Sequence, residues 1–259
     1  MFTPVALKDI CIQGRIPDSC RHYVLGDIHG RLELLQQVLD FIRVDHQIAR
    51  FDAAPPGKVT LICLGDYVDR GEDSSGVIEL LSRFSVEFDC VFLKGNHEEM
   101  MLKVIYQQSD PGRWLINGGI ETLESYGIAP EVIAALRKGA GDTASHSPLA
   151  QMIPVSHLEF LHALPSCYQS GDYYFAHAGI NPELTLAQQR PEDLLWVRKT
   201  FLESEKSFEK IIVHGHTPTK DARPGFGPQR IGIDTGAYAS NRLTCLILEG
   251  GQRTFLQTD

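Results

Sequence analysis

The sequence Lys94-Gly95-Asn96-His97-Glu98-Glu99 follows an apolar run at 90–93 and opens an amphipathic run at 98–107. This succession predicts a strand, a tight turn and a helix, and Gly95 allows the backbone to turn sharply. Asn96 and His97 would then lie at the carboxyl end of a buried strand, where open α/β sheets bind ligands. An amide oxygen can bind a hard cation and an imidazole can move protons, but this stretch alone is equally typical of a plain turn.

Two more stretches have the same form, and two later apolar runs end in histidine. The run before residue 26 leads into Gly-Asp-Ile-His-Gly at 26–30, and the run 59–64 leads into Gly-Asp-Tyr-Val-Asp-Arg-Gly at 65–71. Runs at 172–176 and 210–213 precede His177 and the stretch His-Gly-His at 214–216. The strand ends therefore predict one shared site that gathers carboxylate, amide and imidazole groups.

The first hundred residues alternate between strand and helix patterns. Apolar runs predict strands at 22–25, 58–64 and 88–93, and helical spacing predicts helices at 31–43 and 74–84. A β-α-β-α-β order of this kind predicts a mostly parallel sheet. The residues before the first strand, 1–20, are expected to form an irregular arm.

The segment 108–165 has a different character. It lacks strong strand runs and contains short helical patterns at 120–126, 130–138 and 156–164, with an exposed loop expected at 142–148. We expect a helical insertion or cap at about 108–165 within a single domain at 1–259. The stretch from Trp114 to Gly119 would form part of a rim over the site, or else an ordinary packing tryptophan and turn.

The remaining sequence returns to strand patterns. It predicts a helix at 191–201 and strands at 172–176, 210–213, 229–234, 242–249 and 253–257, the last three antiparallel. This number of strands predicts an α/β fold with two packed sheets flanked by helices.

Composition is that of an ordinary globular protein. The 259 residues are 43% hydrophobic and 22% charged, and 33 acidic against 24 basic residues give a formal charge of −9. We expect no nucleic-acid partner from this balance, and no membrane span because no apolar stretch is long enough. The six cysteines show no disulfide framework and no signal peptide is visible, so a cytoplasmic location is expected.

The motifs Gly-Asp-x-His-Gly, Gly-Asp-x-Val-Asp-Arg-Gly and Gly-Asn-His-Glu occur in this order. Together they resemble the calcineurin-like metallophosphoesterases, and within these the bacterial serine/threonine phosphoprotein phosphatases. The matching positions extend from Asp27 to His216 and cover most of the chain. The resemblance implies a four-layer sandwich of two mixed β-sheets with helices outside. It also implies two divalent cations, most readily manganese, although nitrogen and oxygen ligands together also suit iron or zinc.

The resemblance further implies which residues bind the cations. The positions that match the family's metal ligands are Asp27, His29, Asp66, Asn96, His177 and His216. The first three would bind one cation, and Asp66 would bridge to a second cation bound by the others. His214 does not match a ligand position and is expected to be a neighbour of the site.

Catalytic and phosphate-binding roles follow from the same resemblance. His97 would protonate the leaving oxygen, and Asp69 would hold its imidazole. Arg70, Arg198 and Asn96 would bind the substrate phosphate.

Three functions are compatible with these residues. The first is a phosphomonoesterase, specifically a serine/threonine protein phosphatase that uses direct attack of a metal-bound hydroxide on a phosphorylated protein or small phosphate ester. The second is a symmetrical dinucleoside tetraphosphate (Ap4A) hydrolase, but such enzymes usually lack an equivalent of Asp69 and have Asp in place of Glu98. The third is a catalytically silent phosphate-binding module, against which the retention of the whole residue set argues. The sequence is silent on oligomeric state.

Overall fold

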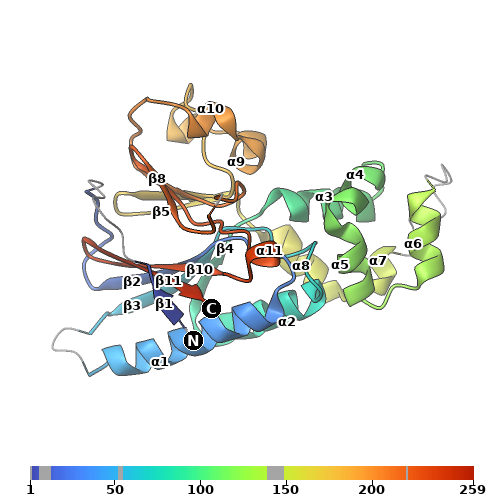
Figure 1. Cartoon of the computed structure of the whole chain (residues 1–259), viewed down its shortest axis with the longest axis horizontal. Helices are drawn as coiled ribbons and strands as arrows, with labels where there is room; N and C mark the ends of the chain where they lie inside the picture. Colours follow the sequence, from blue (N-terminus) through green and yellow to red (C-terminus); the bar gives the residue numbers. More distant parts are fainter. Residues whose placement is uncertain (1, 6–12, 52–54, 139–148, 220) are drawn as a thin grey trace.

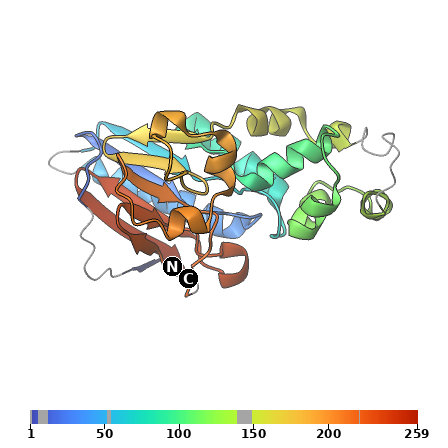
Figure 2. The ribbon, with the colours of Figure 1, turned by 90° about the horizontal axis from the view of Figure 1, so that it is seen from above.

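The described part of the chain has the predicted two-sheet architecture. The computed structural model describes residues 2–5, 13–51, 55–138, 149–219 and 221–259 (Figure 1). Two mixed sheets pack face to face, and helices cover their outer faces (Figure 1, Figure 2). The helices on one side are α1 (Leu32–Ala49) and α2 (Ser74–Glu87), and those on the other are α9 (Pro191–Trp196) and α10 (Lys199–Leu202). The expectation of an α/β sandwich is therefore confirmed.

The first sheet consists of β1 (Phe2–Pro4), β2 (Cys20–Leu25), β3 (Lys58–Cys63), β4 (Asp89–Phe92), β10 (Thr244–Glu249) and β11 (Gln252–Thr258). The order is β1-β11-β10-β2-β3-β4, with β2, β3 and β4 parallel as predicted. The predicted hairpin of β10 and β11 is also confirmed. The prediction of an irregular arm at 1–20 is wrong for its first residues, because β1 pairs with β11. These strands are far apart in the sequence, so no local pattern reveals the pairing.

The second sheet consists of β5 (Cys167–Ser170), β6 (Tyr173–Ala176), β7 (Ile211–His214), β8 (Gly225–Gly227) and β9 (Arg230–Gly232). The order is β5-β6-β7-β9-β8, with β6, β7 and β9 parallel. The prediction that 229–234 would pair with the two later strands is wrong. Ile231 and Ile233 are buried in the core between the sheets, so this segment pairs with β7 before the chain crosses to the first sheet.

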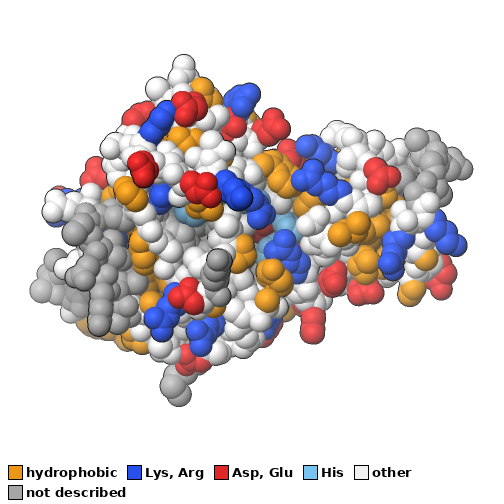
Figure 3. Space-filling view, turned by 45° about the horizontal axis from the view of Figure 1, so that its top comes forward, with side chains coloured by type: hydrophobic (Ala, Val, Ile, Leu, Met, Phe, Trp, Pro, Cys, Tyr) orange, Lys and Arg blue, Asp and Glu red, His pale blue; other side chains and the backbone are white. Residues whose placement is uncertain are grey.

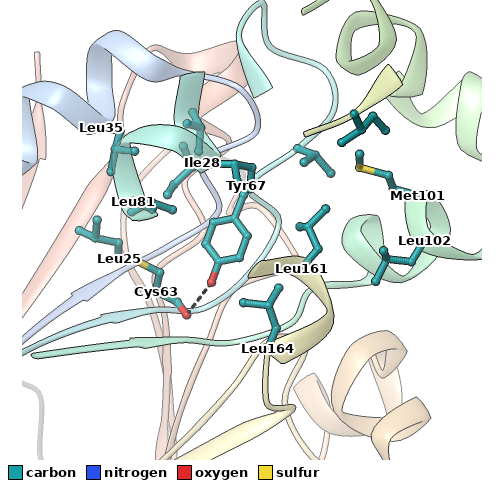
Figure 4. Close-up of a cluster of buried hydrophobic side chains, with 14 of the residues drawn as sticks. Leu25, Ile28, Leu35, Cys63, Tyr67, Leu81, Met101, Leu102, Leu161 and Leu164 are labelled. Atoms are coloured by element: carbon teal, nitrogen blue, oxygen red, sulfur yellow. Dashed lines mark hydrogen bonds between the residues drawn. The ribbon is translucent and has the colours of Figure 1, made fainter. Parts of the chain in front are cut away.

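Strands β2 and β3 are buried on both faces, as parallel strands usually are. Val24 and Ile62 face the second sheet, whereas Leu25 and Cys63 face the helices. On the helix side, the Tyr67 hydroxyl donates to the Leu93 carbonyl at 2.7 Å. It also lies 3.3 Å from the Cys63 carbonyl, the contact that Figure 4 draws. The loop after β3 is thereby fixed to the neighbouring strand at the edge where the polar motifs begin.

The helical insertion extends from one end of the sandwich (Figure 1). It contains α4 (Gly112–Trp114), a π-helical turn at Leu115–Gly119, α5 (Ile120–Ser125), α6 (Pro130–Arg137), α7 (Leu149–Met152) and α8 (Val155–Ala163). The three predicted helices at 120–126, 130–138 and 156–164 are confirmed as α5, α6 and α8. The loop expected at 142–148 lies outside the described residues, and the assignment of the whole chain to one domain stays a prediction.

The helix predicted at 191–201 is broken in two. Val197 is extended and Arg198 has φ −135° and ψ −102°, so α9 ends and α10 begins around this residue. The break allows the Arg198 side chain to reach His216, to whose Nε2 its Nε donates at 3.0 Å. Within the described ranges, no helix combines the length and apolar character needed to cross a bilayer.

His22 links the two sheets and gives the stability a pH dependence. Its Nε2 lies 2.8 Å from Ser170 Oγ across the interface, and burial lowers its pKa to about 4. Because the unfolded chain binds this proton at higher pH than the folded one, stability is lost as pH falls from 6.5 towards 4. Relative to His22→Gln, wild type should lose about 1–2 kcal/mol more unfolding free energy between pH 7 and pH 5.

Urea unfolding of both proteins at several pH values measures this difference. His162→Gln, which changes an exposed histidine on α8, serves as the control and should follow wild type. Parallel pH dependence of wild type and His22→Gln would contradict the prediction.

Candidate metal centre

The ends of five strands meet at one edge of the sandwich. Three strands of the first sheet lead into the motifs at 26–30, 65–71 and 94–99, and two strands of the second lead into His177 and His216. All six residues predicted as metal ligands are at most 4% exposed: Asp27, His29, Asp66, Asn96, His177 and His216. Burial of so many polar side chains at one edge is costly unless they share partners.

Asp66 lies at the centre of this group. Its Oδ2 is 3.5 Å from His29 Nε2, and its Oδ1 is 3.4 Å from His177 Nε2. The ligand atoms of two triplets, His29–Asp66–His97 and Asp66–His177–His216, each lie within 4.8 Å of one another. Two neighbouring groups with one carboxylate in common are what two bridged cations require.

The imidazole tautomers fit a cation better than a proton. Nδ1 of His177 lies 3.0 Å from the carbonyl oxygen of Leu64, which can only accept, so Nδ1 carries the hydrogen. Nε2 of His177 is then an acceptor, yet it faces Asn96 Oδ1 at 2.9 Å and Asp66 Oδ1 at 3.4 Å. His29 has the same arrangement, with Nδ1 2.8 Å from the Val68 carbonyl oxygen. Acceptors gathered in this way suit a positive ion.

The charges of the buried carboxylates support the same conclusion. Burial raises the pKa of Asp27, and the negative charges of Asp234 and Asp66 raise it further. Burial also raises the pKa of Asp66 and lowers that of His177 to about 3. The site is thus short of positive charge, which bound divalent cations would supply.

Asp27 is placed differently from the other predicted ligands. Its carboxylate accepts from the backbone N–H of His216 at 3.0 and 3.2 Å. It does not belong to either of the two triplets found among the described residues.

His97, a member of the first triplet, forms a buried pair with Asp69, which lies outside both triplets. The His97 Nδ1–H donates to Asp69 Oδ2 at 2.6 Å, and both side chains are at most 2% exposed. Burial is the main cause that lowers the pKa of His97 and raises that of Asp69. Arg70 Nη2 lies 3.1 Å from His97 Nε2, the nitrogen that faces the site.

Two arginines border the histidines. Arg70 Nη1 donates to His29 Nε2 at 3.0 Å, and Arg198 contacts His216 as described above. Figure 3 shows basic side chains on the surface around the exposed edges of histidines. A cavity of about 770 Å³ adjoins Arg70 and is also lined by Leu115, Ile116 and Tyr238. Positive charge is therefore concentrated here, although the chain as a whole is acidic.

Left-handed backbone is concentrated at the same edge. The site residues with φ between 48° and 73° are His29, Asp66, Asp69, Arg70 and His216. Such conformations are strained for non-glycine residues and persist where surrounding contacts enforce them. Glu98 makes contacts of this kind, since its buried carboxylate accepts from the backbone N–H groups of Gly95, Asp66 and Tyr67 at 2.8–2.9 Å. Its pKa is raised by burial to about 8.

The sequence missed several residues that support the site. Glu98 was identified only as a mark of enzyme type. Residues 115–118 line the cavity beside Arg70, in agreement with the expected rim, whereas Trp114 is 1% exposed and its indole N–H donates to Asp69. Tyr238, whose ring lies 4.6 Å from the Arg70 guanidinium carbon, has no signal in the sequence. His214 lies outside both triplets and packs against Phe201.

A shared carboxylate, imidazoles on both sides and adjacent arginines define a class of phosphate-ester hydrolases that use two metal ions. Residues 21–239 match the model of the calcineurin-like phosphoesterases. The chain belongs to this family.

Relatives with names of two kinds resemble the chain. Serine/threonine-protein phosphatase 1 of Salmonella typhimurium is 30% identical over 86% of this chain and 90% of its own length. The asymmetrical bis(5'-nucleosyl)-tetraphosphatase PrpE of Halalkalibacterium halodurans is 25% identical over 86% and 88%. A crystal structure of a putative diadenosine tetraphosphatase has a TM-score of 0.58 at 23% identity, covering 92% of this chain and 94% of that one, and so supports the fold.

Asp66→Asn tests the shared carboxylate directly. The substitution removes the negative charge of the residue that both triplets share and replaces one of its two acceptor oxygens with an amide NH₂ group. After manganese loading and desalting, metal content should fall from about two ions per chain to below one. Elemental analysis by mass spectrometry measures it. Asp45→Asn alters a carboxylate paired with Arg21, away from the site, and should retain the wild-type content.

Proposed function

We propose that this chain is a dinuclear-metal phosphomonoesterase that acts on phosphoserine and phosphothreonine in proteins. The observation that carries the proposal is the 2.6 Å contact between His97 Nδ1 and Asp69 Oδ2 at the edge of the metal centre. A serine or threonine alkoxide is a poor leaving group and needs a proton from a positioned acid. A nucleotide leaving from a polyphosphate chain needs that proton much less. The protein phosphatase relative supports the same assignment.

The metal ligands we propose are Asp27, His29 and Asp66 for one ion, and Asp66, Asn96, His177 and His216 for the other. The distances from Asp66 to the imidazoles support this division, and manganese suits the mixture of oxygen and nitrogen donors, as do iron and zinc. The bound ions would supply charge stabilisation and an activated water. Both oxygens of Asp27 now accept from the His216 N–H, so at least one of them would have to turn towards the ion when Asp27 binds it.

Two arginines would bind the phosphate oxygens. Arg70 now donates to His29 Nε2, the nitrogen that faces Asp66, so an ion bound there would free this guanidinium group for the phosphate. Arg198 donates to His216 Nε2, whereas His216 Nδ1 faces His177, so Arg198 lies beside the proposed metal ligands without competing for their ligand nitrogens. Guanidinium groups match phosphate oxygens with two parallel hydrogen bonds. Asn96, at the start of α3 (Asn96–Ile105), would contribute its amide to the same phosphate.

His97 would act as the acid. Its Nε2 faces the site while Nδ1 is held by Asp69, so the proton on Nε2 would pass to the leaving oxygen. Asp69 fixes the ring orientation and stabilises the imidazolium before transfer.

We also propose that the protein is cytoplasmic. Among the residues that the structure describes, the cysteines at 20, 63, 90, 167 and 245 are free, which supports this location.

The second candidate function is hydrolysis of dinucleoside tetraphosphates. A relative of similar coverage has that activity in its name, and the cavity beside Arg70 is large enough for part of a nucleotide. The deciding experiment strips the metal, restores manganese and compares a phosphoserine and phosphothreonine peptide panel with diadenosine tetraphosphate. Faster turnover of the dinucleotide would overturn our proposal. Inactivity on both substrates and on p-nitrophenyl phosphate would favour a silent binding module.

His97→Asn tests the acid role. Loss of the proton donor should lower kcat on a phosphoserine peptide by about 10²–10⁴-fold, while manganese content stays that of wild type. The control is His162→Asn, which alters an exposed histidine of the insertion and should leave kcat unchanged. Equal losses of metal and activity in His97→Asn would show instead that His97 supports the metal centre.

A further inference from the structure

The helical insertion contacts the His97–Asp69 pair through the carboxylate of Asp69. Asp69 is fully buried, and its Oδ1 accepts from the Thr122 hydroxyl at 2.7 Å. The Trp114 indole N–H lies 3.0 Å from both oxygens of the same carboxylate. Both donors belong to the insertion, whereas Asp69 and His97 belong to the motifs at the strand ends. The insertion is therefore joined by hydrogen bonds to the predicted acid.

The backbone of the same loop is also fixed by the insertion. The Asp69 N–H donates to Thr122 Oγ1 at 2.8 Å and to Ser74 Oγ at 3.0 Å. The Arg70 N–H donates to the Gly118 carbonyl at 3.2 Å. Gly118 has φ +105°, and a Cβ there would lie 2.4 Å from Arg70 N, so only glycine allows this approach.

These contacts hold an unfavourable backbone. Asp69 and Arg70 are consecutive non-glycine residues with φ of 73° and 69°. Left-handed conformations at such residues cost energy and require support from their surroundings. In addition, a buried carboxylate needs a donor for each oxygen. Thr122 meets both needs, because its hydroxyl binds the backbone and the side chain of Asp69 at once.

We propose that Trp114 and Thr122 are positioning residues that orient His97 through Asp69. This proposal rests on the proposed function, in which His97 is the acid. With Thr122 on Oδ1 and Trp114 bridging both oxygens, the carboxylate is held so that Oδ2 meets His97 Nδ1. A carboxylate without these donors could rotate and leave the imidazole unsupported. Trp114 and Thr122, which are both buried, thereby contribute to proton transfer through Asp69 alone.

A consequence separates this role from general structural support. Proton donation matters most when the leaving oxygen is strongly basic, as in phosphoserine, and least for p-nitrophenolate. Loss of a positioning donor should therefore slow the peptide more than p-nitrophenyl phosphate. Loss of folded protein or of metal would slow both substrates equally.

The test uses the manganese-loaded full chain with Thr122→Val, Thr122→Ser and Trp114→Phe. Thr122→Val keeps the size but removes the hydroxyl, and should lower kcat about tenfold or more on a phosphoserine peptide, but less than about threefold on p-nitrophenyl phosphate. KM and manganese content should be unchanged. Thr122→Ser restores the hydroxyl and should restore the peptide rate, and Trp114→Phe should show the same substrate dependence as Thr122→Val.

A second readout is independent of activity. The His97 Nδ1 proton, in its short contact with Asp69, should give a downfield proton NMR signal that is absent from His97→Asn. Thr122→Val should shift or broaden this signal, and Thr122→Ser should retain it. Equal kinetic losses on both substrates, or an unchanged signal in Thr122→Val and Trp114→Phe, would overturn the inference. Wild type that cleaves no phosphomonoester would overturn the proposed function instead, and the NMR comparison would still decide the orientation of His97.

Discussion

The central physical constraint is the burial of a single carboxylate, that of Asp66, between two sets of imidazoles. Its two oxygens lie 3.5 Å from one ring and 3.4 Å from another, too far for strong hydrogen bonds and close enough to share ions. Strands from both sheets must end at the same edge for this to occur. Oδ2 faces His29, which follows a strand of the first sheet, and Oδ1 faces His177, which follows a strand of the second sheet. The packing of the two sheets and the geometry of the site therefore depend on each other.

Backbone amides, rather than side chains alone, maintain this arrangement. Glu98 collects N–H groups from two loops and holds the left-handed backbone of Asp66. A carboxylate buried so completely is destabilised unless several donors satisfy it. Burial raises the pKa of Glu98 to about 8, although four backbone N–H groups donate to its carboxylate and act in the opposite direction. Bound cations at the adjacent centre would add further compensation.

Much of the fold could be predicted because it follows from local periodicity. Apolar spacing distinguishes strand from helix in each of these segments. It predicted the parallel strands, the helices between them and the helices α5, α6 and α8 of the insertion. The strand at 229–234 was placed in the wrong sheet, because its own residues do not state which neighbour they meet. The break at Arg198 was missed because the tertiary contact with His216 overrides a continuous helical pattern.

The candidate site was predictable to a similar extent. Motif resemblance identified residues at strand ends, and the structure gathers them at one edge. Trp114 and Thr122 donate hydrogen bonds to Asp69 across 45 and 53 positions of the sequence. No local sequence pattern around a tryptophan or a threonine identifies a hydrogen-bond partner so far away. The contact of Asp27 with the His216 backbone was equally invisible. These failures concern contacts between distant segments, for which the sequence alone gives no register.

The π-helical turn at 115–119 has one side packed against the motif loop and one side exposed. Inward, Gly118 meets the backbone of Arg70 and tolerates no added side chain. Outward, Ile116 is 88% exposed and borders the neighbouring cavity. Exchange of Ile116 would therefore reshape the wall of this cavity and leave the contact between Gly118 and Arg70 in place. One short turn thus joins an exchangeable surface position to a backbone contact that permits no side chain.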